Sequence, residues 1–152
     1  MRQVSDLYGT AQLNNIPVDH FPLGKREALS LMDTDGACYI ALDPARVKDT
    51  ADQRCKLAHE LGHCLTGSFY NIYATADNRQ RHENKADKWA VEYLIPAEQL
   101  DEAIAAGYSE LWQLAEYFGV TEDMMRKALC WYVYGNLAAE LYFKIPGFAP
   151  PP

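Results

Sequence analysis

The sequence has no run of 18 apolar residues, so we expect no helix that spans a membrane. Its first residues, MRQVSDLYGTAQLNN, lack the apolar stretch and the small-residue cleavage site of a secretory signal, which favours a cytoplasmic location. Cationic residues are also few: 14 Lys and Arg stand against 21 Asp and Glu, which gives a formal net charge of −7. Because attraction to phosphate dominates the affinity for nucleic acids, direct nucleic-acid binding is not expected.

Cysteine is scarce and shows no regular spacing. The four cysteines, Cys38, Cys55, Cys64 and Cys130, form no C-x-x-C pair. In a reducing compartment such residues are expected to be free, buried thiols. Although Cys55 and Cys64 flank the histidine motif described below, we assign both to packing, with a redox role for Cys55 as the alternative.

The remaining composition is that of an ordinary globular protein, with 49% hydrophobic and 23% charged residues. A chain of 152 residues can bury roughly two-thirds of its unfolded surface around a single core. We therefore expect one domain over residues 1–145, followed by a proline-rich tail over residues 146–152.

The order of apolar and turn residues predicts an α+β fold. A helix is expected in the first dozen residues, and Pro17 and Pro22 then predict a loop. The runs EALSLM and ACYIAL flank the turn sequence DTDG, as in a β-hairpin, and Pro44 ends the second run. We expect residues 37–42 to form a strand at or near the edge of a small antiparallel sheet.

Helices are expected over most of the rest of the chain. The sequence T-A-D-Q, typical of a capping box, predicts a helix from Thr50 to about Thr66 that Gly67 terminates. A polar, turn-prone stretch follows, and RHENKADKWAVEYLIP then returns to a helical period that Pro96 ends. After Pro96 the pattern predicts a C-terminal helical unit. Its expected helix starts are Ser109 and Thr121, and its expected helix ends are Gly107, Gly119 and Gly135.

The helix expected from Thr50 to about Thr66 carries the motif H-E-x-x-H at His59, Glu60 and His63. Residues four apart lie on one face of an α-helix, so the two histidines can direct ring nitrogens to one point. Zinc accepts such nitrogens at about 2.0–2.1 Å. Glu60 lies beside this point, where a carboxylate can take a proton from a water molecule on the metal.

A catalytic zinc ion needs a third protein ligand. His20 and His82 are the other histidines, but the second helix offers Glu83 and Asp87 in an E-x-x-x-D pattern that begins 20 residues after His63 (83 − 63). We predict that Glu83 completes the ligand set and that Asp87 accepts the second ring N–H of a histidine ligand. One zinc ion per chain is expected.

These segments resemble the ImmA/IrrE family of zinc metallopeptidases. HELGHCLTGSF and ENKADKWAVEYLIP are similar to the family pattern, an A-H-E-L-G-H helix followed by E-x-x-A-[ND]-x-[FW]-A-x-x-L-[LI]-x-P. The similarity extends from about Gly36 to Leu129. The sequence departs from the pattern at Trp89, where phenylalanine is commoner, and at Lys85, where many relatives have glutamate.

The resemblance implies a zincin-like fold and a zinc-dependent endopeptidase. It implies zinc ligands at His59, His63 and Glu83, with Glu60 as the general base. The substrate that it implies is a protein, a helix-turn-helix repressor of a phage or mobile element or a related stress regulator.

Further site residues are predicted from their position. Tyr70, Tyr73 and His82 are near enough in sequence to stabilise the oxyanion of the reaction. In zincin-like enzymes a sheet edge beside the cleft pairs with the extended substrate, and Tyr39 or Ile40 would then line a substrate pocket. The alternative is that their strand belongs to the core.

Two other functions compete with the peptidase. The segment LWQLAEYFGVTEDMMRKAL resembles the helix-turn-helix of a DNA-binding regulator, but its second helix begins with acidic residues and offers DNA only Arg126 and Lys127. We therefore interpret this segment as core packing. The other alternative is a catalytically silent zinc-binding adaptor, and the presence of Glu60 argues against it. The core residues expected in the segment are Leu111, Leu114, Ala115, Phe118, Met125 and Leu129.

Overall fold

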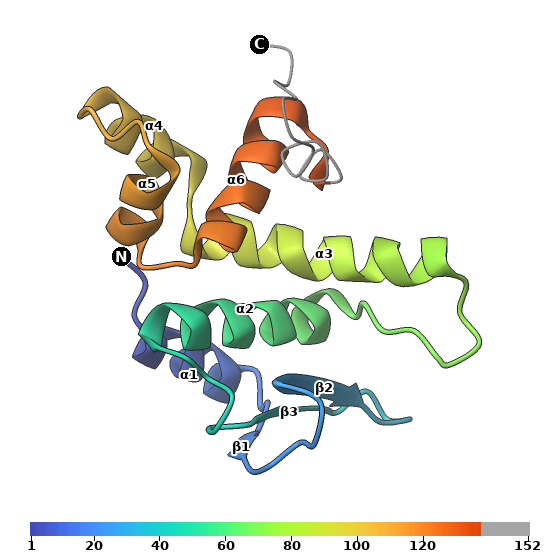
Figure 1. The fold of residues 1–152 in the computed structure, drawn as a ribbon. Helices are drawn as coiled ribbons and strands as arrows, with labels where there is room; N and C mark the ends of the chain where they lie inside the picture. The colour runs from blue at the N-terminus through green and yellow to red at the C-terminus, as the bar shows by residue number, and fades with distance from the viewer. Residues whose placement is uncertain (138–152) are drawn as a thin grey trace.

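The computed structural model describes residues 1–137, so the tail expected at residues 146–152 lies outside the described residues. The described part is an α+β fold (Figure 1). Its elements are α1 (Val4–Leu13), β1 (Val18–His20), β2 (Ala28–Met32), β3 (Cys38–Leu42), α2 (Thr50–Thr66), α3 (Ala76–Leu94), α4 (Ala97–Ala105), α5 (Leu111–Phe118) and α6 (Glu122–Tyr134). No helix within residues 1–137 has both the length and the apolar character needed to cross a bilayer.

Helix α2 lies at the centre of the fold, with the sheet on one side and α3 on the other (Figure 1). Leu57 and Leu61 of α2 are fully buried in the core that these layers share. Helix α1 packs along α2, and α4, α5 and α6 gather at the C-terminal end of α3 (Figure 1). This arrangement places the H-E-x-x-H helix where both the sheet and α3 can contribute side chains to it.

The sheet confirms the expected hairpin and corrects its surroundings. Strands β2 and β3 pair antiparallel, with Ser30 opposite Ile40, but β1 pairs parallel to β3, so the sheet is mixed. The strand order is β1-β3-β2, so β3 is the middle strand: it lies next to an edge of the sheet, as one form of the expectation had it, but it is not an edge strand itself. Strand β1 was expected to be a loop. Its three residues lie between Pro17 and Pro22, and they extend because they pair with β3.

Several helix boundaries differ from the predicted ones by one residue or more. Asp49, rather than Thr50, caps α2, since its carboxylate accepts the backbone N–H of Asp52 at 2.8 Å. Helix α3 begins at Ala76, capped by Thr75, and is longer than predicted because its polar first turns are helical too. The expected ends at Gly67, Gly119 and Gly135 are confirmed, each in the left-handed conformation. Thr121 caps α6 as expected, whereas Glu110 rather than Ser109 precedes α5, and Ala106 rather than Gly107 is the C-cap of α4.

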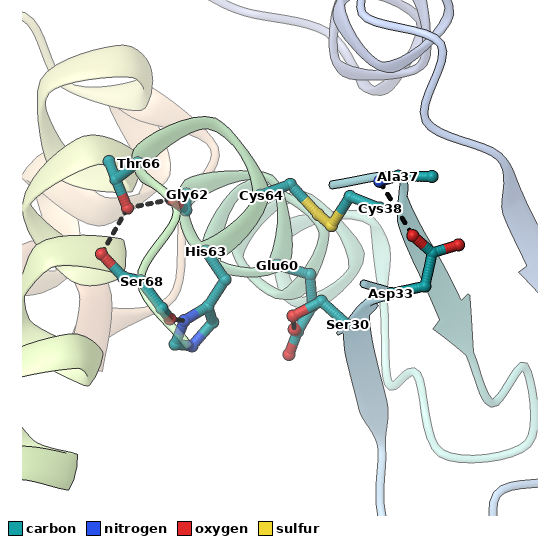
Figure 2. Close-up of a disulfide and its surroundings, with 10 residues drawn as sticks. All are labelled: Ser30, Asp33, Ala37, Cys38, Glu60, Gly62, His63, Cys64, Thr66 and Ser68. Atoms are coloured by element: carbon teal, nitrogen blue, oxygen red, sulfur yellow. Dashed lines mark hydrogen bonds between the residues drawn. A yellow bond between two sulfur atoms is a disulfide. The ribbon is translucent and has the colours of Figure 1, made fainter. Parts of the chain in front are cut away.

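The expectation that every cysteine is a free thiol is wrong. Cys38 of β3 and Cys64 of α2 form a disulfide, while Cys55 and Cys130 are free and buried (Figure 2). The pairing was hidden because it joins residues 26 apart in sequence, which only the packing of α2 on the sheet brings together. The bond ties the middle strand to the residue that follows His63.

Candidate active site

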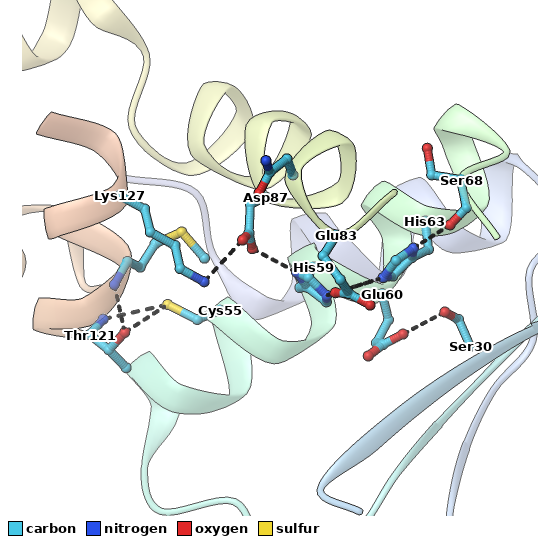
Figure 3. Close-up of polar contacts among 12 residues, drawn as sticks. Ser30, Cys55, His59, Glu60, His63, Ser68, Glu83, Asp87, Thr121 and Lys127 are labelled. Carbon is cyan, nitrogen blue, oxygen red and sulfur yellow. Dashed lines mark hydrogen bonds and ion pairs between the residues drawn. The ribbon is translucent and has the colours of Figure 1, made fainter. Parts of the chain in front are cut away.

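His59 and His63 direct ring nitrogens to one point, as their spacing predicts. The two Nε2 atoms lie 3.1 Å apart. Glu83 of α3 places Oε2 at 2.8 Å from the Nε2 of His59 and 3.3 Å from that of His63 (Figure 3). These side chains form a group that could hold a metal ion. Two imidazole nitrogens and one carboxylate oxygen are a donor set that suits a catalytic zinc ion.

The other ring nitrogen of each histidine is engaged elsewhere, which leaves both Nε2 atoms for a metal. His59 Nδ1 lies 2.8 Å from Oδ1 of Asp87, the contact predicted from the E-x-x-x-D pattern. His63 Nδ1 lies 2.5 Å from the backbone carbonyl of Ser68. Such contacts fix the tautomer and the orientation of a ligating imidazole. The Ser68 contact was not predicted, because a backbone carbonyl has no residue-type signal.

The close approach of α2 and α3 makes this convergence possible. Gly62 lies between the two histidines in sequence, and a Cβ atom there would be 2.5 Å from the carbonyl oxygen of Ala86. Ala86 is itself fully buried. A glycine in the motif therefore allows the helix that carries Glu83 and Asp87 to come within reach of the histidines.

Glu60 faces the sheet side of the site. The hydroxyl of Ser30 in β2 donates to Oε2 of Glu60 at 2.5 Å (Figures 2 and 3). This contact was also not predicted, although Ser30 is the polar member of an otherwise apolar strand. Ser30 and Ile40 are cross-strand partners and so share the face of the sheet that is turned to α2.

Neighbouring charges and hydrogen bonds shift the pKa values of His59 and Glu83 strongly. Burial lowers the pKa of His59, but the hydrogen bonds to Asp87 and Glu83 outweigh it and raise that pKa to about 10. Burial raises the pKa of Glu83, yet the two histidines and Tyr70 hold it well below its usual range. With this raised pKa, His59 of the metal-free protein is an imidazolium ion at neutral pH. A metal ion that binds its Nε2 has to displace a proton.

The remaining predicted residues divide into near and distant ones. Tyr70 donates its hydroxyl to Oε1 of Glu83 at 2.9 Å, and the ring of His82 lies 6.1 Å from the ring of Tyr70. His82 Nδ1 is buried without a hydrogen-bond partner among the described residues. Tyr73 is 87% exposed and borders a different cavity, in the loop between α2 and α3. Tyr39 lies on the face of the sheet turned away from α2, and its hydroxyl approaches Asp33.

A cavity of about 340 Å³ opens beside Glu60 and His59. Its wall includes Lys127 of α6, whose Nζ lies 3.0 Å from Oδ2 of Asp87 (Figure 3). The contribution of α6 was not predicted, because its residues lie about 40 positions after Asp87 in sequence (127 − 87). The residues around the cavity are Arg26, Glu27, Ala28, Cys55, Lys56, His59, Glu60, Asp87, Thr121, Asp123, Met124 and Lys127.

Helices α5 and α6 are core elements, as expected. Of the six expected core residues, Leu114, Ala115, Phe118 and Met125 are buried in the common core, and Leu111 and Leu129 are partly buried against it. The two cations that the helix-turn-helix interpretation needed form ion pairs within the chain. Arg126 pairs with acidic residues of its own helix, and Lys127 pairs with Asp87 beside the candidate metal site. This geometry gives no support to a DNA-reading helix.

The comparison with known families agrees with this geometry. A family model described as the IrrE N-terminal-like domain of the M78 peptidases matches residues 15–129, a span that contains the H-E-x-x-H motif, Glu83 and Asp87. No match was found among curated proteins. The family model covers most of the chain, and it confirms the resemblance seen in the sequence. The chain therefore belongs to the ImmA/IrrE family of metallopeptidases.

Proposed function

We propose that this protein is a zinc-dependent endopeptidase with one zinc ion per chain. The observation that carries the proposal is the convergence of the Nε2 atoms of His59 and His63 with Oε2 of Glu83, next to Glu60. Family membership supports the class of reaction, and the donor set supports zinc over the harder metals, which prefer oxygen ligands.

The three ligands would hold the metal at the point where their donor atoms meet. When bound, a zinc ion supplies a lowered pKa for its water and polarises the carbonyl of the scissile bond. The residues around it supply orientation. Asp87 and the Ser68 carbonyl hold the two imidazoles, and Tyr70 holds the second carboxylate oxygen of Glu83.

Glu60 is proposed as the general base. Ser30 engages its Oε2, which leaves Oε1 to accept a proton from the attacking water. The carboxylic acid so formed then gives its proton to the leaving amine, and the carboxylate is restored. Tyr70 and His82 are the proposed contacts for the oxyanion. The hydroxyl of Tyr70 donates to Glu83 and would turn from it to the oxyanion, and the ring of His82 lies 6.1 Å from that of Tyr70, whereas Tyr73 is exposed to solvent.

The substrate strand is proposed to lie along β2 rather than β3. Both edges of β3 are occupied by its neighbours, whereas within the described sheet one edge of β2 has no partner strand. Strand β2 also carries Ser30, which contacts the proposed base. An extended peptide added to this edge would gain backbone hydrogen bonds with little demand on its sequence.

The family resemblance extends the proposal to the substrate class, a helix-turn-helix repressor of a phage or mobile element or a related regulator. The protein would then act in the cytoplasm, where such regulators bind DNA. The oxidised pair Cys38–Cys64 is unusual for that compartment, so its redox state in cells tests the location.

Metal content separates this proposal from a structural coincidence. Purified wild type should contain one zinc ion per chain by elemental analysis, Glu83→Ala should lose most of it, and Glu98→Ala, at an exposed residue of α4, should keep it. A peptide library read by mass spectrometry should then show cleavage by wild type and none by zinc-loaded Glu60→Gln. Equal cleavage by Glu60→Gln would refute the general base, and zinc binding without any cleavage would favour the adaptor.

A further inference from the structure

Lys127 lies at the end of a chain of polar contacts that leads to the metal cluster. Its Nζ is 3.0 Å from Oδ2 of Asp87, and Oδ1 of the same carboxylate is 2.8 Å from Nδ1 of His59 (Figure 3). His59 Nε2 in turn lies 2.8 Å from Oε2 of Glu83. Three elements therefore meet at Asp87: α2 through His59, α3 through Asp87 itself, and α6 through Lys127.

Burial makes the carboxylate of Asp87 dependent on its partners. The side chain of Asp87 is 9% exposed and that of Lys127 is 29% exposed. A carboxylate in such a place is costly unless both oxygens are compensated, and removal of one partner of a buried pair leaves a charge that is drawn towards water. Lys127 and His59 each take a different oxygen, so the cation on one side holds the carboxylate in the orientation that serves the imidazole on the other.

We propose that Lys127 is a positioning residue of the metal site, which acts through Asp87 to hold His59 in its ligating orientation. This inference rests on the proposed function, because it concerns the affinity of the same cluster for zinc. It assigns to α6 a part in the site that neither the H-E-x-x-H motif nor the E-x-x-x-D pattern contains.

Two effects of losing Lys127 oppose each other, which makes the sign of the result informative. By Coulomb's law alone, loss of a nearby cation strengthens the binding of a divalent cation. If Lys127 orients Asp87, its loss weakens zinc binding instead, since contacts of this kind change metal affinity by about 10-fold to 100-fold.

The test is the dissociation constant of zinc for the full chain, measured by competition with a chromophoric chelator. Lys127→Met should bind zinc roughly tenfold more weakly than wild type. Lys127→Arg, which keeps the charge and the donors, should recover most of that loss. The matched control is Arg126→Met, which removes the same charge from the neighbouring residue of α6, whose guanidinium bonds Asp123 rather than Asp87. It should leave the zinc affinity within twofold of wild type or raise it.

A double variant shows whether Lys127 acts through Asp87. In an Asp87→Ala background, Lys127→Met should cause no further loss of zinc affinity. Thermal unfolding of the metal-free variants checks that they are folded, and Lys127→Gln replaces Lys127→Met if the latter is not. Zinc affinity that is unchanged or higher in Lys127→Met overturns the inference while leaving the peptidase proposal intact, whereas a wild type that binds no zinc overturns both.

Discussion

Gly62 of α2 and Ala86 of α3 touch so closely that a Cβ atom on Gly62 would lie 2.5 Å from the carbonyl oxygen of Ala86 and 2.9 Å from its Cα. Both of these neighbours are backbone atoms in a helix, so they cannot turn away as a flexible side chain would. The distance between the two helices sets how far Glu83 can reach towards the histidines. The same contact therefore serves packing and the metal cluster.

Replacing Gly62 with alanine should separate the two helices. We expect Gly62→Ala to lower the free energy of unfolding by about 1–3 kcal/mol, the usual cost of overpacking, and to weaken zinc binding as well. Gly9→Ala is the matched control, because Gly9 lies in α1 and a Cβ there meets nothing within 4 Å. It should stabilise the protein by roughly 0.5–1 kcal/mol. Urea unfolding of both variants measures this, and a stable Gly62→Ala that binds zinc normally would show that the helices are not held this close.

The Cys38–Cys64 disulfide should contribute to stability by restricting the unfolded chain. The two cysteines are 26 residues apart in sequence, and for a loop of this length the chain-entropy relation gives about 3.5 kcal/mol. The double variant Cys38→Ser/Cys64→Ser should lose about this much free energy of unfolding, and a reducing agent should destabilise wild type while leaving the double variant unchanged. A count of four free thiols in denatured, oxidant-treated wild type would contradict the pairing.

Proton release should accompany zinc binding. Because the pKa of His59 is raised to about 10, this residue carries a proton at pH 7 that zinc has to displace. Titration calorimetry in buffers of different ionisation enthalpy should show at least one proton released per zinc ion at pH 7, since the pKa of His63 is raised as well, and the affinity should rise with pH towards 10. A binding enthalpy that is the same in every buffer would show that His59 is already neutral.

The free energy of unfolding of the metal-free protein should fall as the pH rises, whereas the zinc affinity should increase. A histidine whose pKa is raised on folding stabilises the folded state. This contribution is fully present below pH 6.5, the pKa in the unfolded chain, and is lost as the pH rises to about 10, the pKa in the folded protein. Wild type should therefore lose stability relative to Asp87→Asn between pH 6.5 and 10, because the variant lacks the charge that raises the pKa. Parallel unfolding curves of the two proteins across this range would contradict the assignment.

The predictions from sequence succeeded where the information lies within one element. The spacing of His59 and His63 on one helix, and of Glu83 and Asp87 on the next, is enough to place four side chains on two faces. The hairpin was predicted for the same reason, because its turn and its two runs are contiguous. The helical spacing and the hairpin both follow from local sequence patterns. To predict them, one does not need to know which elements are in contact.

The features that were missed depend on contacts between elements distant in sequence. The short strand β1 is extended only because β3 lies beside it, and the partner of Cys64 is known only once α2 packs on the sheet. Lys127 resembled a DNA-binding cation because nothing in the sequence of α6 reveals that Asp87 is within 3.0 Å. Ser30 became a site residue through the register of β2 and β3 over α2, which the hairpin alone does not define.

The hydrogen bond between Ser30 and Glu60 should affect turnover without affecting the metal. Ser30 contacts Glu60, the proposed base, and none of the proposed ligands, so Ser30→Ala should keep one zinc ion per chain. Loss of one neutral-to-charged hydrogen bond, worth about 1.5 kcal/mol or somewhat more, should lower kcat about tenfold on a peptide that wild type cleaves. Ser30→Thr retains a hydroxyl and should recover part of the rate, and Ser109→Ala, at an exposed serine outside the site, should match wild type. A full rate for Ser30→Ala would mean that Glu60 does not need this contact, whereas loss of zinc together with rate would place Ser30 among the groups that hold the ligands rather than the base.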